Sequence, residues 1–550
     1  MKTISRGIGA LALALTGTAS LAAGPAARFD FVEYRALDSA PATPPGSYRN
    51  PVLPGFQPDP SIVKVGSEFY LVTSTFSWFP GLPIYHSTDL VNWRLVGNAI
   101  DRPGQMDFSR LGTNRGLFAP TIEHHGGRFW IVNTCIECGG NYVITADRPE
   151  GPWSDPVWLG FGGIDPSLVF GTDGRAWIVS NDAPPGEPLY EGHRAIWLQE
   201  FDPAAMRMKP GRTLLVNGGL DIKDKPVWAE GPHIYKVGEW FYLTAAEGGT
   251  AERHSQTIYR SRSIEGPYEP GPANPILTQR DLPADRPDRV EATGHADMVR
   301  LDDGSWWGVF LATRPFAGQS TLMGRETFLL PVRWVDGWPR FLEPGQAMPA
   351  VVGEPALPPS PATDWRHWRD DFTAPLSGEW IGIRTPGARQ QVALDREGGA
   401  LVLMPGADGA GGLGKPAFIG RRLRHHAAEY VTRLAFAPAR EGDFAGLLAF
   451  MDEGHFVTLG IEGAEIVLRR RAHPGEDERG LALARIARPG ARAVELRLRF
   501  EGGVARASAR EAGSATWRAV GGAIDVEPLA SVHAGLFTGL VVGPYALAAR

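Results

Sequence analysis

Residues 227–236 read Val-Trp-Ala-Glu-Gly-Pro-His-Ile-Tyr-Lys, and this stretch decides the fold. It places the carboxylate of Glu230 at a Gly-Pro corner that runs into a short apolar strand. The turn residue Gly238 and an aromatic strand at 240–243 follow. The same unit occurs five times in the chain, with an aromatic strand 10 to 12 residues after its first residue. The first residues of the five units are Asp59, Ala119, Asp165, Glu230 and His295.

Recurrence of a strand-turn-strand unit with periodic glycine and aromatic residues favours a β-propeller over a solenoid. The spacing of 48 to 65 residues between successive aromatic strands is long for a propeller and leaves room for extended loops. In a radial array the equivalent position of every unit lies near the central axis at one end. We therefore expect the three carboxylates Asp59, Asp165 and Glu230 to converge at the hub of a five-bladed wheel.

The N-terminus has the layout of a secretory signal peptide. Lys2 and Arg6 precede an apolar run at 8–15, which is too short to span a bilayer, and small residues follow at 20–23. We expect residues 1–23 to be a signal peptide, with the mature protein in the periplasm or outside the cell. Residues 24–43 are expected to form a flexible leader.

The charge and composition limit the class of partner. A formal net charge of −6, or −8 once Lys2 and Arg6 are removed, argues against nucleic acid, which needs a basic surface. No transmembrane segment is apparent, and the sequence leaves the oligomeric state open. A neutral ligand is easier to reconcile with this charge.

The only two cysteines are Cys135 and Cys138. In an exported protein this spacing favours a local disulfide, with two free thiols as the alternative. Catalysis or metal binding is disfavoured, because two thiolates supply half of a zinc site.

A second domain follows the repeats. The propeller is expected over residues 44–343 and a proline-rich linker over 344–364. From residue 365 to 550 the sequence has strands of two-residue alternation, clearest at 494–500. Half-buried strands at short spacing predict a β-sandwich, so the whole chain is expected to be all-β.

Three ordered carboxylates at one mouth of the axis would raise the pKa of at least one of them, because like charges at close range oppose ionisation. One protonated and one ionised carboxyl group is the arrangement that acid–base hydrolysis of an acetal requires. A single Asp-Pro-Ser is more often a solvated turn, but its recurrence at equivalent positions favours function. Calcium binding is the rival use, although no D-x-D-x-D-G loop is present.

Several stretches closely resemble glycoside hydrolase family 43, the β-xylosidases and α-L-arabinofuranosidases. The resemblance covers most of residues 50–545 and includes the concanavalin-like β-sandwich. The matching motifs are Asn-Pro-Val-Leu-Pro-Gly-Phe-Gln-Pro-Asp-Pro-Ser at 50–61, Ser-Thr-Phe-Ser-Trp-Phe-Pro-Gly-Leu-Pro-Ile at 74–84, Gly-Ile-Asp-Pro-Ser-Leu at 163–168, Ala-Glu-Gly-Pro-His at 229–233, Gly-His-Ala-Asp at 294–297 and Gly-Arg-Glu-Thr at 324–327.

The resemblance implies an inverting mechanism on a five-bladed propeller. Asp59 matches the general base that activates water, and Glu230 matches the general acid. Asp165 matches the third carboxylate, which positions and tunes the acid. No cofactor is implied to be required. His295 matches an axial histidine that in some members binds calcium or a water, so a structural Ca²⁺ at the propeller axis is a candidate, with a satisfied core histidine as the alternative.

Four further residues match positions around the family's sugar site. Arg325 matches an arginine that hydrogen-bonds sugar hydroxyls, with a surface ion pair to Glu326 as the alternative. Phe76 and Phe118 match rings that wall the sugar subsite, with core packing as the alternative; Phe118 departs from the tryptophan common in β-xylosidases. Phe537, in the C-terminal domain, matches a loop residue that closes one side of the pocket.

We therefore expect a β-xylosidase that removes terminal pentoses from short oligosaccharides. An α-L-arabinofuranosidase or a bifunctional enzyme is the nearest alternative, because the two sugars present similar hydroxyls. A sugar-binding propeller without catalysis and a retaining transglycosidase are the more remote ones.

Overall fold

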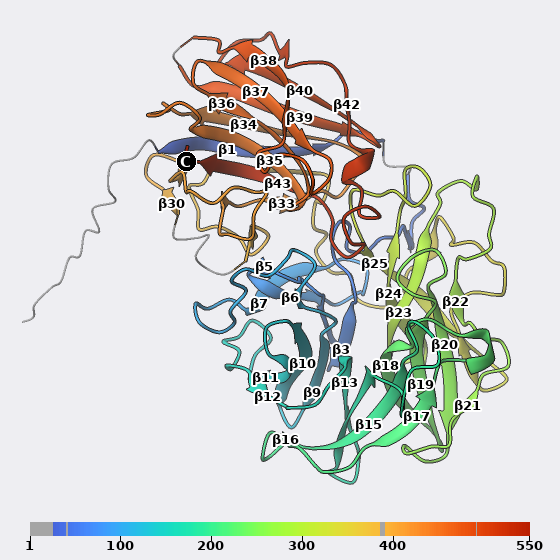
Figure 1. Ribbon diagram of the computed structural model, residues 1–550. Coiled ribbons are helices and arrows are strands. Elements are labelled where there is room, and N and C mark those ends of the chain that lie inside the picture. Colours follow the sequence, from blue (N-terminus) through green and yellow to red (C-terminus); the bar gives the residue numbers. More distant parts are fainter. Residues whose placement is uncertain (1–25, 40–41, 385–390, 491, 550) are drawn as a thin grey trace, which may run out of the picture.

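The computed structural model describes residues 26–39, 42–384, 391–490 and 492–549. The expected signal peptide at 1–23 lies outside these residues. The protein has two lobes built from β-strands, a propeller below and a sandwich above in the view of Figure 1. The described residues contain no α-helix. They also contain no helix of any kind that is long and apolar enough to cross a membrane. Two short 3-10 helices occur, η1 (Ile222–Asp224) and η2 (Glu527–Leu529).

The lower lobe is a five-bladed propeller of antiparallel sheets, as the repeats predicted. The blades are, in order: β3 (Ser61–Val65), β4 (Glu68–Val72), β6 (Gly81–Ser87) and β7 (Arg94–Ile100); β8 (Gly116–Leu117), β9 (Thr121–His125), β10 (Arg128–Ile136), β11 (Gly140–Ala146) and β12 (Val157–Trp158); β13 (Ile164–Phe170), β14 (Ala176–Asp182), β15 (Ala195–Asp202), β16 (Arg207–Met208) and β17 (Thr213–Asn217); β18 (Glu230–Val237), β19 (Trp240–Glu247), β20 (Ser255–Ser261), β21 (Glu269–Pro270) and β22 (Leu277–Thr278); β23 (Glu291–Arg300), β24 (Trp306–Thr313), β25 (Glu326–Val335) and β26 (Trp338–Arg340).

The innermost strands form a closed ring. Strands β3, β9, β13, β18 and β23 each contact the next, and β23 returns to β3. Each inner strand follows the first residue of a sequence unit or includes it, so the repeated position lies at the hub. The predicted convergence of the unit heads follows from this ring.

The carboxylate of Asp297 joins three of the inner strands. One oxygen accepts hydrogen bonds from the Ser61 hydroxyl at 2.8 Å and the Ile62 N–H at 2.9 Å, both on β3. The other accepts from the Tyr235 hydroxyl on β18 at 2.8 Å. The Ser61 hydroxyl also accepts from the Ile122 N–H of β9 at 3.1 Å. Polar groups of the repeated motifs therefore hold the hub together.

The upper lobe is a sandwich of a nine-stranded and a seven-stranded sheet around a large apolar core. The nine-stranded sheet contains β1 (Ala27–Ala36), β28 (His367–Asp370), β30 (Val392–Asp395), β31 (Ala400–Leu403), β34 (Ala427–Ala435), β39 (Val494–Glu501), β40 (Val504–Glu511), β41 (Arg518–Ala519) and β42 (Ile524–Asp525). The seven-stranded sheet contains β32 (Ala417–Phe418), β33 (Arg421–Arg422), β35 (Phe444–Asp452), β36 (His455–Glu462), β37 (Glu465–Arg471), β38 (Leu481–Ala487) and β43 (Val541–Leu547).

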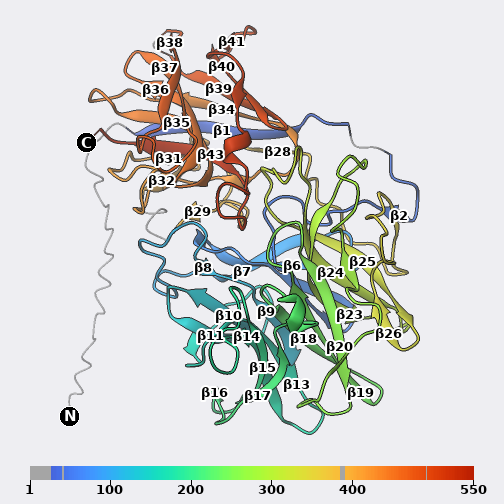
Figure 2. The same cartoon turned by 45° about the vertical axis from the view of Figure 1, so that its right-hand side comes forward.

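Strand β1 overturns one prediction. Residues 24–43 were expected to form a flexible leader, but Ala27–Ala36 lie inside the nine-stranded sheet, between β31 and β34. The side chains of Phe29, Val32 and Tyr34 are fully buried in the sandwich core. Figure 2 shows β1, in blue, crossing the lobe formed by the C-terminal strands. The sandwich is therefore built from both sides of the propeller in sequence.

Two small sheets lie outside the blades and the sandwich. Strand β2 (Ser47–Tyr48) pairs with β27 (Val352–Gly353), so the segment that enters the propeller lies beside the one that leaves it. Strand β5 (Trp78–Phe79) of the first blade's loop pairs with β29 (Gly382–Ile383). The second pairing attaches the sandwich domain to the propeller by backbone hydrogen bonds.

The buried side chain of Arg424 also joins the lobes, through a hydrogen bond to the segment before the first blade. Arg424, which is 1% exposed, donates to the Pro54 carbonyl at 2.7 Å and to the Glu379 carboxylate at 2.5 Å. Burial would raise the pKa of Glu379, but Arg424 and two neighbouring arginines hold it below its ordinary value. The Leu423 carbonyl lies 2.7 Å from where a Cβ on Gly55 would stand, so the approach of the two backbones requires glycine there.

Removing one partner of this pair should destabilise the protein more than removing both. The substitution Arg424→Met leaves the Glu379 carboxylate buried without its main partner, which costs about 3 kcal/mol. The double variant with Glu379→Met should recover part of the loss. Urea unfolding at pH 7 measures the midpoints of the native protein, the single variant and the double variant. Equal losses in the single and double variants would contradict this coupling.

Candidate active site

Left-handed backbone turns mark the hub ends of the inner strands. Asp59, Asp165 and His295 have φ values of 51°, 52° and 52°, and Gly231 has 54°. Residues other than glycine rarely adopt this left-handed backbone region, and aspartate tolerates it better than most of them. The pairing of β13, β18 and β23 shifts register at these positions, as a β-bulge does. The bulges explain how the repeated corners re-aim their first side chains.

The carboxylate of Asp59 lies beside a permanent positive charge. Arg325 approaches one Asp59 oxygen at 3.3 Å, and the Ser74 hydroxyl donates to the other at 2.6 Å. His295 Nδ1 lies 3.6 Å from the same oxygen as Arg325. All four side chains are buried. Arg325 therefore pairs with Asp59, and Glu326 pairs instead with Arg314.

Asp165 and Glu230 lie close enough to affect each other's ionisation. Burial, followed by the charges of Glu230 and Asp59, raises the pKa of Asp165 well above its ordinary value. Burial also raises the pKa of Glu230 to about 7, which Arg325 and Arg194 oppose and the charge of Asp59 increases. The structure thus brings the three predicted carboxylates into one buried, electrostatically coupled group. A proton is kept on this group near neutral pH.

His295 is neutral at pH 7 and closely packed. Burial lowers its pKa to about 4, which the charge of Asp59 opposes. A Cβ on Gly231 would lie 2.6 Å from His295 Nε2, so the two nitrogens face Asp59 and the Gly231 backbone. Calcium takes about six to eight oxygen ligands. The described residues hold no group of three or more His, Cys, Asp or Glu side chains that could bind a metal. The surroundings of His295 do not fit a calcium ion held by side chains.

Three phenyl rings stand together next to Arg325. The Phe76 ring centroid lies 5.2 Å from that of Phe118 and 5.5 Å from that of Phe537, and Phe118 and Phe537 are 5.7 Å apart. The guanidinium carbon of Arg325 lies 4.8 Å from the Phe537 ring. Phe76 is buried, whereas Phe118 and Phe537 are half-buried. Phe537, from the sandwich domain, is therefore brought to the propeller residues as expected.

Two family models match the chain. Glycosyl hydrolases family 43 matches residues 48–339, and the β-xylosidase C-terminal concanavalin A-like domain matches 369–550. The chain belongs to glycosyl hydrolases family 43. It is a glycoside hydrolase with a five-bladed propeller and a concanavalin-like sandwich.

Relatives of this family 43 enzyme match over most of its length. A non-reducing end α-L-arabinofuranosidase of Bacteroides ovatus is 40% identical over 75% of both chains. A xylosidase/arabinosidase of Butyrivibrio fibrisolvens is 38% identical over 74% of this chain and 79% of its own. The crystal structure of a GH43_12 protein from the capybara gut metagenome has a TM-score of 0.85 at 35% identity, covering 95% of this chain and 99% of the other.

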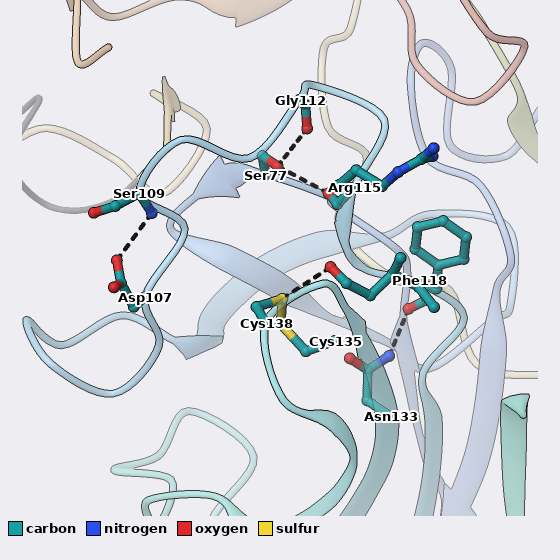
Figure 3. Close-up of a disulfide and its surroundings, with 10 residues drawn as sticks. Ser77, Asp107, Ser109, Gly112, Arg115, Phe118, Asn133, Cys135 and Cys138 are labelled. Atoms are coloured by element: carbon teal, nitrogen blue, oxygen red, sulfur yellow. Dashed lines mark hydrogen bonds between the residues drawn. A yellow bond between two sulfur atoms is a disulfide. The ribbon is translucent and has the colours of Figure 1, made fainter. Parts of the chain in front are cut away.

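The two cysteines of the family 43 domain form the predicted local disulfide. Figure 3 shows Cys135 and Cys138 at the end of β10, close to Phe118. The Asn133 side chain of the same strand donates to the Phe118 carbonyl, and the Phe118 N–H donates to the Thr134 carbonyl at 3.0 Å. The strand closed by the disulfide therefore also holds the backbone of one ring of the aromatic group.

Sequence reasoning missed three residues around the carboxylates. Ser74 lies within the matched motif at 74–84 but was not singled out. Arg194 lies in the loop between β14 and β15 of the third blade and affects the ionisation of Glu230. His254 is buried, and its ring lies 2.7 Å from where a Cβ on Gly294 would stand. Of the three, only Ser74 could have been found from the sequence, because it begins the matched motif and lies two residues before Phe76.

The contact between Gly231 and His295 predicts the effect of one methyl group. Gly231→Ala should force His295 away from Asp59 and lower kcat/KM by about 10²-fold, as misplacement near 1 Å does. Gly238→Ala is the matched control, because φ is +58° there and no atom lies within 4 Å of the added Cβ. Steady-state kinetics and thermal melting compare the two. Equal loss of activity in both variants would mean that backbone strain, not the histidine contact, is responsible.

Proposed function

We propose that the protein is an inverting exo-glycosidase that hydrolyses terminal non-reducing β-D-xylosyl residues from xylo-oligosaccharides. The observation that supports this most is the buried group of three coupled carboxyls with unlike partners. Asp59 has a cationic partner in Arg325, whereas the pKa of Glu230 is raised to about 7. One carboxylate compensated by a cation and one carboxyl that holds a proton suit a base and an acid.

In this proposal Asp59 is the general base and Glu230 the general acid. Asp59 takes a proton from a water as the water oxygen bonds to the anomeric carbon. The bond between that carbon and the leaving oxygen breaks, and Glu230 gives its proton to the leaving oxygen. Asp165 positions Glu230 and tunes its acidity. Arg325 orients Asp59 and offers its remaining donors to the sugar, with Phe76, Phe118 and Phe537 walling the subsite.

An α-L-arabinofuranosidase, or an enzyme with both activities, is the second candidate. The similarity to the Bacteroides ovatus arabinofuranosidase and the Butyrivibrio fibrisolvens xylosidase/arabinosidase favours it. Phe118 supports this candidate, because a phenyl ring leaves more room than the larger indole of tryptophan. We also propose that the enzyme is exported by the signal peptide at 1–23, so that it meets oligosaccharides outside the cytoplasm.

Paired aryl glycosides test the substrate. We expect hydrolysis of an aryl β-D-xyloside, with NMR showing α-xylose as the first product because inversion changes the anomer. A higher kcat/KM for the matched aryl α-L-arabinofuranoside would favour the second candidate. Release of β-xylose as the first product would contradict the inverting mechanism.

Two variants separate the acid from the base. Glu230→Gln should lower the rate on xylobiose by about 10²–10⁴-fold, because the sugar leaving group of xylobiose needs a proton to depart. The same variant should lose far less on a dinitrophenyl xyloside, whose phenolate leaves unprotonated. Asp59→Asn should lose activity on both substrates, since the water still needs a base. An unchanged rate for Glu230→Gln on xylobiose would remove Glu230 from the mechanism.

The pH profile of the native enzyme provides the control for this assignment. With a pKa of about 7, Glu230 is protonated below neutral pH and loses its proton above it. On xylobiose kcat/KM should therefore fall as pH rises through about 7. In Glu230→Gln this alkaline limb should be absent.

A further inference from the structure

The nine-stranded sheet has an outer face on the far side of the sandwich from the propeller. Its inner face covers the sandwich core. The seven-stranded sheet lies on the other side of that core and contributes Phe450 and Phe456 to a cluster with Trp78 of the propeller. The outer face of the nine-stranded sheet is thus separate from the carboxylate group, and no role assigned above uses it.

A groove of about 350 Å³ crosses this outer face. Five arginines, three glutamates and the rings of Phe31 and Trp517 line most of it. Its volume falls within the roughly 300–1,000 Å³ typical of small-molecule sites. Five cations against three anions leave the groove positive in a chain whose formal net charge is −6.

The surplus positive charge follows from the strand register. Phe31, Arg433, Glu495 and Arg510 lie side by side across β1, β34, β39 and β40. The buried carboxylate of Glu495 pairs with Arg433 at 2.8 Å and with Arg510 at 2.5 Å. One carboxylate therefore serves two guanidinium groups.

Arg497 is the cation with the weakest partner in the groove. It lies 4.0 Å from the nearest oxygen of Glu429 and donates its Nε–H to the neutral Ser508 hydroxyl at 3.0 Å. A second shared anion is Glu33, whose carboxylate pairs with Arg369 at 3.0 Å and also with an arginine and a histidine. An added carboxylate would give Arg497 a close anionic partner and would lower the surplus of the groove from two positive charges to one.

The aromatic rings orient the guanidinium groups. The guanidinium carbon of Arg369 lies 3.6 Å from the Phe31 ring centroid. Those of Arg497 and Arg510 both lie 4.3 Å from the Trp517 ring centroid. The rings therefore stack on cations, which favours recognition by charge over stacking of a neutral sugar. Planar forks held in this way suit bidentate hydrogen bonds to a carboxylate.

We propose that this groove binds a uronic-acid residue of an acidic polysaccharide. The positive charge of the groove indicates a ligand with a carboxylate. That this carboxylate belongs to a saccharide rests on the proposed function. Binding at this second site would keep the enzyme on its polymer while the propeller acts on chain ends, which raises the local concentration of those ends.

Calorimetry on the full chain with Glu230→Gln tests binding without hydrolysis. The probes are xylo-oligosaccharides that carry one glucuronic acid, neutral xylo-oligosaccharides of equal length, and oligogalacturonate. We expect the acidic xylo-oligosaccharides to bind about tenfold more tightly than the neutral ones, with the difference falling as NaCl rises. Tighter binding of either acidic probe supports the proposal, and their order identifies the polymer.

Arg497→Gln, added to this protein, should abolish the preference for acidic probes and leave binding of the neutral probe unchanged. Arg485→Gln is the matched control. Arg485 lies on β38 of the other sheet, is 41% exposed and pairs with Glu465 at 2.8 Å. Both substitutions, made in the native enzyme, should leave the melting temperature and the hydrolysis of an aryl glycoside unchanged.

Equal affinity for acidic and neutral probes would overturn the proposal, as would equal weakening by Arg497→Gln and Arg485→Gln. Either result would mean that the arginines form only a solvated polar surface on the outer sheet face and have no binding role. Failure of the proposed function gives a different result, because then the native enzyme does not hydrolyse the aryl glycoside, whatever binds to the groove.

Discussion

The propeller depends on the carboxylate of Asp297, which ties the inner strands β3, β18 and β23 to one another across the hub. A ring of five short strands has no helix to cover its centre, so polar groups at the axis must satisfy one another. Ser61 extends the network to β9, and the Ser167 hydroxyl makes an equivalent link from β13 to the Pro232 carbonyl at 2.5 Å. The serines of the Asp-Pro-Ser motifs therefore link neighbouring inner strands at the hub.

The same convergence creates an electrostatic cost at the neighbouring corners. Asp59, Asp165 and Glu230 are all buried, and only Asp59 has an ion-pair partner among the described residues. Burial and mutual repulsion keep a proton on the remaining pair near neutral pH. The ring geometry therefore gives the three carboxyl groups different surroundings, with a guanidinium paired to Asp59 and no ion pair to Asp165 or Glu230 among the described residues.

Much of this arrangement could be predicted from the sequence, because a repeated unit places equivalent residues at equivalent points. Glu230 and Asp165 are recognised by their corners, and the strand at 494–500 by its alternation. Arg194 could not be found, since it lies in a loop whose path no local pattern sets. The error at residues 24–43 has another cause. The stretch 27–36 alternates apolar and polar residues as a strand does, but one extra residue near Asp30 breaks the alternation. Because the stretch follows the expected signal peptide, it was interpreted as part of a flexible leader.

The position of β1 makes the propeller an insertion within the sandwich. Its partner β34 begins at Ala427, so some four hundred residues separate two strands that lie next to each other. During synthesis β1 leaves the ribosome early and waits for its neighbours β28, β31 and β34, which are made only after the propeller. The catalytic lobe can complete its own ring in that interval, whereas the sandwich closes last. A gene fragment that begins after the linker would encode a sheet with a missing interior strand, and its unpaired edges would invite aggregation.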